Sequence, residues 1–381
     1  MSTVSIARCE TYEPDAVEMA LSQVLAPLGG ISAFVSPGNR VLLKVNLLSR
    51  ALPERAVTTH PELVRALIRA VRGAGGQPTV GDSPGGPNTA GLVRRVWQDS
   101  GIAEVCAEED VPMVLFDDDT VRVPNPAGSL YGAFTLGRVV ADADVVITVP
   151  KFKTHGLMMF TGAVKNLFGC IPGLEKAQYH LKLPDRNDFG SMLVDLMLAC
   201  RPALAVMDAV VGMEGEGPAG GTPRQIGALI ASADCVALDV VASSMAGLDP
   251  MEVYSNRAAA KRDLGPSSAD EVDVVGADWR ELAPEGFALP ARDAGRGLPP
   301  WLARRLTSWT TARPVLERAS DCTLCGTCAK VCPVEAIAIA ANGPVFDRSS
   351  CIRCYCCQEL CPPQAIGLTV PPLARIASRQ R

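Results

Sequence analysis

Residues 40–82 have the sequence RVLLKVNLLSRALPERAVTTHPELVRALIRAVRGAGGQPTVGD, and this pattern sets the architecture of most of the chain. The apolar run 40–48 is typical of a buried strand. Pro61 then begins an amphipathic helix that ends at the glycines of residues 73–76, and residues 77–82 form a second apolar run. A strand, a helix and another strand in this order predict two parallel strands of one sheet.

The same alternation continues along the chain to about residue 280. We predict further strands at residues 111–117, 143–150, 204–211 and 226–232, and further helices at residues 88–101, 192–200 and 235–246. Nearly continuous apolar strands separated by helices are typical of parallel sheets that are covered on both faces. We therefore predict an α/β domain at residues 1–290, with a mostly parallel sheet and flanking helices.

Polar segments follow four of the predicted strands. They are Asn46, residues 82–86 (DSPGG), residues 151–155 (KFKTH) and residues 212–221 (GMEGEGPAGG). In open α/β sheets, ligands bind in the crevice at the carboxyl ends of the strands. We therefore expect these four segments to share one crevice.

Nine of the fourteen cysteines lie between Cys322 and Cys361. The segments CTLCGTCAKVCP, from Cys322, and CIRCYCCQELCP, from Cys351, share the spacing C-x2-C-x2-C-x3-C-P. This is the pattern of bacterial two-cluster ferredoxins, in which the fourth cysteine of each run binds the other cluster. The pattern predicts one 4Fe–4S cluster on Cys322, Cys325, Cys328 and Cys361, and a second on Cys351, Cys354, Cys357 and Cys332.

The spacing leaves Cys356 over as a packed thiol or a reserve ligand, because it follows Cys354 after only one residue. A pair of zinc sites is the alternative, but two matching quartets that each end in Cys-Pro favour iron–sulfur clusters. We predict a small C-terminal α+β two-cluster ferredoxin domain at residues 315–370, a connector at residues 291–314 and a basic tail at residues 371–381.

The composition argues against several classes of protein. The 381 residues are 48% hydrophobic and 20% charged, which is ordinary for a globular chain. A net charge of -5 argues against a nucleic-acid binder. No segment approaches the roughly 18 uninterrupted apolar residues of a transmembrane helix. Residues 1–15 lack the pattern of a secretory signal, so we expect a cytoplasmic protein with reduced cysteines.

Cations and polar turn residues gather at the predicted crevice. A small anionic substrate or cofactor is predicted to be bound by Lys44, Asn46, Asp82, Lys151 and Asn166, because ammonium and amide groups together cradle a carboxylate or phosphate. The alternative for any single lysine is a solvated surface position.

A second set of residues is predicted to be catalytic: Lys153, His155, Lys165 and Asp208. The lysines would hold the anion, and His155 or Lys165 would donate protons during a reduction. Histidines 60, 155 and 180 show no metal-binding spacing, so structural roles are favoured over ligation. Residues 215–220 match G-x-G-x-x-G, but Pro218 interrupts the match and a strand follows, so NAD is not predicted. The sequence identifies no flavin.

Several motifs together resemble a known family. They are K-T-H at residues 153–155, K-N-L-F-G at residues 165–169, G-M-E-G-x-G-P at residues 212–218 and C-Y-C-C at residues 354–357. The chain resembles the family called domain of unknown function 362, joined to a C-terminal two-cluster ferredoxin. The resemblance implies an iron–sulfur protein of this architecture, without a reaction.

Three functions are consistent with these features. The first is an oxidoreductase whose clusters pass electrons to a small anionic substrate in the crevice. The second is a non-enzymatic adaptor that relays electrons to a redox partner protein, and the third is a metal or cluster delivery factor. A deep cavity with lysines close to a cluster would favour the enzyme, whereas a shallow apolar face would favour the adaptor.

Overall fold

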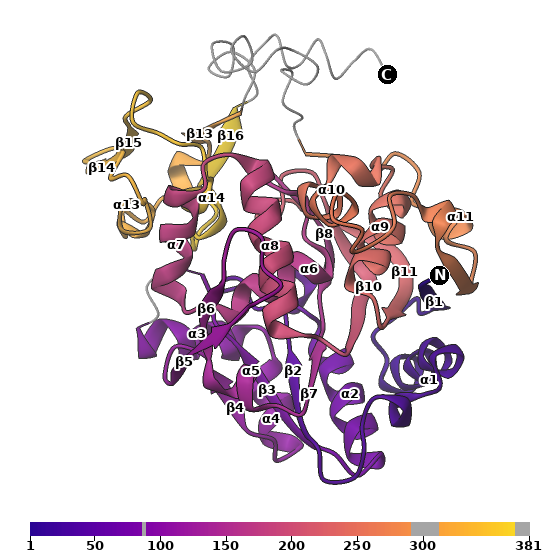
Figure 1. Ribbon diagram of the computed structural model, residues 1–381. Helices are drawn as coiled ribbons and strands as arrows, with labels where there is room; N and C mark the ends of the chain where they lie inside the picture. The colour runs from indigo at the N-terminus through magenta and orange to yellow at the C-terminus, as the bar shows by residue number, and fades with distance from the viewer. Residues whose placement is uncertain (86–88, 291–311, 370–381) are drawn as a thin grey trace.

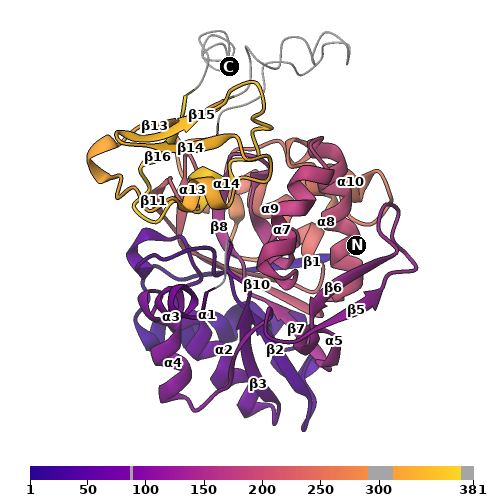
Figure 2. The ribbon, with the colours of Figure 1, turned by 90° about the vertical axis from the view of Figure 1, so that its left-hand side faces the viewer.

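A computed structural model describes residues 1–85, 89–290 and 312–369. Figure 1 shows a large α/β body, with a small C-terminal module (yellow) at one end of it. The turned view in Figure 2 places the same module above the sheet. The predicted tail and most of the predicted connector lie outside the described residues.

One large sheet runs through the body in the order β12-β1-β11-β10-β7-β2-β3-β4, and β8 pairs with both β10 and β9. The pairs β1–β12, β10–β7, β7–β2, β2–β3, β3–β4 and β10–β8 are parallel. The predicted mostly parallel sheet is therefore confirmed. The strands are β1 (Thr3–Arg8), β2 (Arg40–Lys44), β3 (Gln77–Asp82), β4 (Met113–Leu115), β7 (Val145–Thr148), β8 (Lys151–His155), β9 (Met159–Phe160), β10 (Leu204–Glu214), β11 (Thr222–Ser232) and β12 (Asp273–Gly276).

Two polar segments differ from the expectation of loops. Residues 151–155 form β8, whose backbone pairs with β10 at Lys151 and Lys153. Residues 212–214 extend β10, which then turns back into β11, so that β11 is antiparallel to both β10 and β1. The polar side chains of these segments therefore lie on strands of the sheet rather than on exposed loops.

Helices cover both faces of the sheet because successive strand side chains point to opposite faces. In β2, Val41 and Leu43 pack with Leu67 of α2 and Trp97 of α3, whereas Leu42 packs on the opposite face with the core around α8 and α9. The helices are α1 (Pro14–Leu25), α2 (Pro61–Gly73), α3 (Ala90–Asp99), α4 (Ile102–Glu108), α5 (Arg138–Asp142), α6 (Gly162–Asn166), α7 (Gly173–Lys182), α8 (Arg186–Cys200), α9 (Cys235–Met245), α10 (Tyr254–Ala260) and α11 (Trp279–Leu282).

Shorter elements complete the body. A two-stranded sheet pairs β5 (Thr120–Pro124) with β6 (Ala133–Gly137). Single 3-10 turns are η1 (Ala26–Leu28), η2 (Ile31–Ala33), η3 (Pro53–Arg55), η4 (Leu167–Cys170), η5 (Pro250–Glu252) and η6 (Ala269–Glu271).

The C-terminal module is a small α+β unit, as predicted. It contains β13 (Arg313–Leu316), η7 (Ala319–Asp321), α13 (Thr327–Lys330), β14 (Ile337–Ala340), β15 (Gly343–Phe346), α14 (Cys356–Glu359) and β16 (Ile366–Thr369). Strand β13 pairs with β16, and β14 pairs with β15. Strand β13 begins inside the range predicted as connector.

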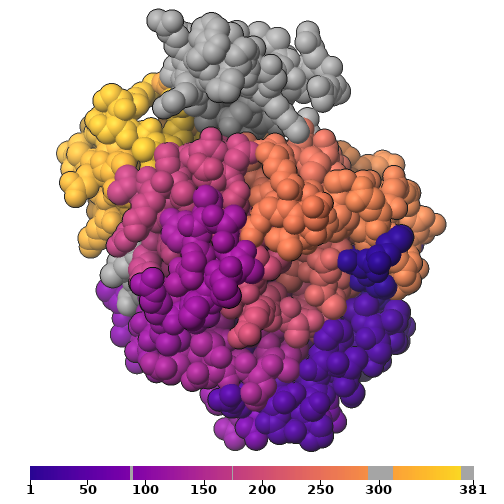
Figure 3. All heavy atoms as spheres, in the orientation of Figure 1, coloured from indigo at the N-terminus to yellow at the C-terminus, as the bar shows by residue number. Residues whose placement is uncertain are grey.

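The module is docked against the α/β body, where Figure 3 shows it next to the magenta part of the surface. Tyr355 is 2% exposed and packs in the same core cluster as the body. The side-chain amide of Gln358 donates to the backbone carbonyl of Glu216 at 3.1 Å, and Arg55 donates to Gln364 at 2.8 Å. This docking fixes the cysteine-rich helix α14 over the carboxyl ends of the strands.

Candidate functional site

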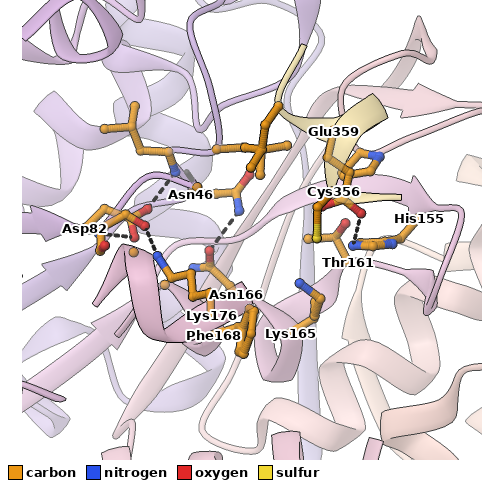
Figure 4. A pocket seen from close by; sticks show the side chains of 18 of the residues that line it. Asn46, Asp82, His155, Thr161, Lys165, Asn166, Phe168, Lys176, Cys356 and Glu359 are labelled. Carbon is orange, nitrogen blue, oxygen red and sulfur yellow. Dashed lines mark hydrogen bonds and ion pairs between the residues drawn. The ribbon is translucent and has the colours of Figure 1, made fainter. Parts of the chain in front are cut away.

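A cavity of about 130 Å³ lies between the α/β body and the module. It has room for roughly four water molecules or one small organic molecule. All four polar segments expected to share a crevice contribute to its wall, through Asn46, Asp82, Lys153 and Pro218. Figure 4 shows Asp82, Asn46, Asn166 and Lys176 on one side, and Glu359, Cys356, His155 and Thr161 on the other, with Lys165 and Phe168 between them.

The first side of the cavity is a hydrogen-bonded network at the ends of β2 and β3. The buried ammonium of Lys44 lies 2.9 Å from Oδ1 of Asp82. Oδ2 of Asp82 also accepts from the backbone N–H of Leu47 at 2.7 Å. Burial raises the pKa of Asp82, and Lys44 and Lys176 oppose that rise. Gly169 passes so close that a Cβ there would overlap the Asp82 carboxylate, so a glycine is needed at this position.

Lys176 approaches the same network from α7. Its ammonium donates to the backbone carbonyls of Ser83 and Pro84. Burial lowers the pKa of Lys176 to about 8.

The second side of the cavity combines β8, α6 and the module. Nδ1 of His155 accepts from the backbone N–H groups of Leu157 and Met158 at 3.1 and 3.4 Å, so Nε2 carries the proton. This Nε2 lies 3.5 Å from Oε1 of Glu359. Burial lowers the pKa of His155 well below its usual value and keeps the ring neutral. His155 therefore directs its Nε2–H towards the Glu359 carboxylate.

The buried Lys153 and the partly buried Lys165 flank this histidine. The Lys153 ammonium donates to the backbone carbonyl of Val57 at 2.6 Å. Lys165 lies 4.8 Å from the ring centroid of Phe168. Burial lowers the pKa of both lysines; the neighbouring Lys165 lowers that of Lys153 further, whereas Glu359 raises that of Lys165. An ammonium whose pKa is lowered gives up its proton more readily.

Two predicted site residues lie elsewhere. Lys151 and Asp208 form a buried ion pair at 2.8 Å and are not among the residues that line the cavity. Asp208 also accepts from the hydroxyl of Tyr12 at 2.7 Å and from the backbone N–H of His60 at 2.8 Å, and the Tyr12 and His60 rings stack at 3.5 Å. The structure thus brings together Lys153, His155 and Lys165 of the catalytic set, and Lys44, Asn46, Asp82 and Asn166 of the binding set.

A second, smaller cavity of about 20 Å³ lies within the module. The four thiols assigned to one cluster all line it: Cys332, Cys351, Cys354 and Cys357. Cys356 instead lines the larger cavity between the domains. The two adjacent cysteines thus line different cavities, although the Cys356 thiol also lies against that of the predicted ligand Cys354.

The other four thiols also lie near one another. Burial raises the pKa of Cys361, and the thiols of Cys325 and Cys322 raise it further. Burial likewise raises the pKa of Cys328, with additional contributions from Cys361 and Cys325. Within the described residues, no three Cys, His, Asp or Glu side chains gather closely enough for a single metal ion.

Sequence reasoning missed several residues of the cavity, among them Lys176, Glu359 and Thr161. Glu359 lies between two predicted ligands, Cys357 and Cys361, and its burial arises only when the module docks against the body. Thr161 follows the short strand β9 and is 4% exposed. The signal that could have identified Glu359 is the run C-C-Q-E-L, in which this acidic residue lies within one helical turn of Cys356 and Cys357.

These features define an iron–sulfur protein in which an α/β domain and a 4Fe–4S module share one cavity. The chain belongs to the family described as domain of unknown function (DUF362), whose model matches residues 41–244, and residues 314–362 match the 4Fe-4S dicluster domain. The family resemblance inferred from the sequence is thus confirmed, and the module has the capacity for electron transfer.

The chain is also similar to particular proteins. It is 38% identical over 291 residues to the thylakoid-associated protein sll1697 of Synechocystis sp. (strain ATCC 27184 / PCC 6803 / Kazusa), covering 76% of this chain and 88% of that one. The lactate racemase apoprotein from Thermoanaerobacterium thermosaccharolyticum matches 62% of this chain and 55% of its own length, with 14% identity and a TM-score of 0.39, which is too low to carry an argument. Among the described residues, no helix is both long enough and apolar enough to span a bilayer.

Proposed function

We propose that the protein is a cytoplasmic oxidoreductase in which two 4Fe–4S clusters pass electrons to a small anionic substrate in the cavity between the domains. One observation carries the proposal: the same cavity is lined by cations of the α/β domain and by neighbours of the predicted cluster ligands. Val331 precedes Cys332, and Cys356 precedes Cys357. A ligand in the cavity would therefore contact residues that are adjacent in sequence to two cysteines assigned to a cluster.

The residues of the chain have distinct roles in this proposal. The clusters, held by the eight cysteines in two quartets, supply single electrons when bound. Lys165 and Lys153 hold the anion, and their lowered pKa values suit them to donate the protons that a two-electron reduction consumes. His155 donates a hydrogen bond from Nε2, and the docked module covers one side of the cavity, where a lower dielectric strengthens each of these interactions.

A second role, as a relay to a partner protein, is supported by the outer surface of the module. Cys325 is exposed, and Leu324, Ile339 and Val345 are 45%, 39% and 58% exposed. Apolar side chains near an exposed cluster ligand suit the docking of a redox partner. This surface serves the oxidoreductase as the entry point for electrons, and the adaptor as the exit point.

The test is reoxidation of the reduced protein. Anaerobically purified protein is reduced with dithionite, freed of excess reductant and mixed with small anionic oxidants while the visible absorption is followed. Lys165→Ala should weaken binding about 10- to 100-fold, the scale of a lost charge-assisted hydrogen bond. Lys261→Ala, which removes an exposed lysine, is the matched control.

The relay makes the opposite prediction. If the parent and Lys165→Ala proteins lose electrons at the same rate to every small oxidant, and only a protein acceptor reoxidises them, the cavity plays no part in turnover. The adaptor function would then replace the oxidoreductase.

A further inference from the structure

The orientation of Asn46 is fixed by its neighbours. Nδ2 of Asn166 donates to the backbone carbonyl of Lys44 at 3.2 Å, and a carbonyl can only accept. Oδ1 of Asn166 must therefore face Asn46, which donates to it through Nδ2 at 2.9 Å. Oδ1 of Asn46 is left as the opposite end of that amide. This oxygen is an acceptor whose direction cannot be reversed without losing the bond to Asn166.

That oxygen has no hydrogen-bond partner among the described residues, and it is buried, because only 9% of Asn46 is exposed. A buried acceptor without a partner costs about 1–3 kcal/mol, so water or a ligand must donate to it. A ligand that displaces such a water loses affinity unless it also supplies a donor. The wall formed by Asn46 therefore favours a ligand with an O–H or N–H group.

The neighbouring part of the cavity requires the opposite chemistry. Among the described residues, Lys165 makes no hydrogen bond or ion pair, and its ammonium lies over the ring of Phe168. Oγ1 of Thr161 is also buried without a partner within the described residues. An ammonium and a hydroxyl that face one cavity together suit an anionic acceptor group.

The rest of the lining narrows the class of ligand. A protonated amine would meet the ammonium groups of Lys44, Lys153 and Lys176 in the same cavity, so the donor should be uncharged. Leu47 and Phe168 line the cavity as well, and their apolar surfaces suit carbon atoms rather than a bare inorganic anion.

We propose that the cavity binds a small hydroxy carboxylate, with the carboxylate at Lys165 and Thr161 and the hydroxyl donating to Oδ1 of Asn46. The assignment rests on the proposed function, in which this molecule is the substrate or the product. The proposed function requires only an anionic group on the ligand. The hydroxy carboxylate has in addition an uncharged hydrogen-bond donor on the same carbon skeleton.

The experiment is anaerobic calorimetry of the cluster-loaded protein with two matched pairs: malate against succinate, and glycolate against acetate. The members of each pair differ only in the hydroxyl. The hydroxy acid of at least one pair should bind about tenfold more tightly, the value of one net hydrogen bond. Asn46→Ala should reduce that ratio to about one, and Lys165→Ala should weaken both members alike. Asn342→Ala, at an exposed turn of the module, should change neither.

Several results would overturn the assignment. Equal affinity of the unmodified protein for both members of each pair refutes it without any variant. Tight binding of inorganic phosphate with no preference for a hydroxyl would show a general anion site, and also refutes it. Because calorimetry requires no electron transfer, a hydroxyl preference that depends on Asn46 would stand even if reduced protein were never reoxidised by small molecules. Reoxidation without that preference would leave the oxidoreductase intact and remove only the hydroxy carboxylate.

Discussion

Gly169→Ala tests the network that forms one side of the cavity. The backbone of Gly169 is not in the left-handed region, so the substitution adds a methyl group without backbone strain. That methyl would overlap the carboxylate of Asp82 and would stand 2.6 Å from the ammonium of Lys44. The carboxylate must move, although it is held by Lys44 at 2.9 Å and by the Leu47 N–H at 2.7 Å.

The cost follows from these contacts. Overpacking a well-packed site costs about 1–3 kcal/mol, and breaking a buried ion pair outright costs about 3–5 kcal/mol. The carboxylate is displaced rather than removed, so we expect a loss of about 2–4 kcal/mol in the free energy of unfolding. Binding of small anions should fall with it, because Lys44 is drawn out of position.

The assay is anaerobic urea unfolding followed by tryptophan fluorescence, for which Trp97, 2% exposed in the α/β core, is a reporter. Gly91→Ala is the matched control, because Gly91 lies in α3 with open space around its Cβ position and should gain up to about 1 kcal/mol. The reasoning is refuted if Gly169→Ala unfolds within 1 kcal/mol of the parent by this measure, or if the control is destabilised equally.

Three further predictions concern the clusters, the pH dependence and the docking of the module. Cys357→Ser should reduce the iron content from about eight to about four atoms per chain, whereas Cys356→Ser should retain about eight; the reverse outcome in iron analysis would exchange their roles. Burial lowers the pKa of His180 to about 3, so below pH 6.5 the unfolded protein binds a proton that the folded protein does not. The free energy of unfolding should therefore fall as the pH falls, and from pH 7.5 to 5.5 His180 should account for about 1.4 kcal/mol of this loss. If His180→Phe shows the same dependence of stability on pH as the parent, the prediction is wrong. Gly85→Ala should weaken anion binding without changing the iron content, because the added Cβ overlaps Leu360 of the module. Leu360→Ala should restore binding in the double variant. A double variant that binds no better than Gly85→Ala would argue against altered docking as the cause.

The strands and helices of the α/β body were predictable because their apolar periodicity is local. The strand at residues 77–82 and the helix that begins at Pro61 coincide with β3 and with the start of α2. The same local logic failed for β8. Two lysines and a histidine at alternate positions indicate an exposed loop in isolation, but the body buries all three with Lys153 at 1% exposure.

The membership of the cavity was only partly predictable, because it depends on tertiary contacts. Lysines at strand ends pointed to one crevice, and Lys44, Lys153 and Lys165 line it. Nothing local distinguishes Lys151, which pairs with Asp208 instead, from Lys153 two residues later. Glu359 could not be predicted for a related reason. It belongs to the module, and it becomes buried only where the module contacts β8, which lies more than a hundred residues earlier in the chain. The functional roles of these residues remain predictions.

A cavity with walls from two domains makes cluster retention and ligand binding thermodynamically linked. Leu360 and Cys356 reach the cavity only when the module is folded and docked. A ligand that contacts both walls would therefore stabilise the docked module by up to RT ln(1 + [L]/Kd), and docking of the module would raise the affinity for that ligand by the same factor by which the bound ligand favours docking. If the cavity binds its ligand as proposed, iron supply should set the fraction of molecules that possess a complete site, and abundant ligand should protect the clusters from loss.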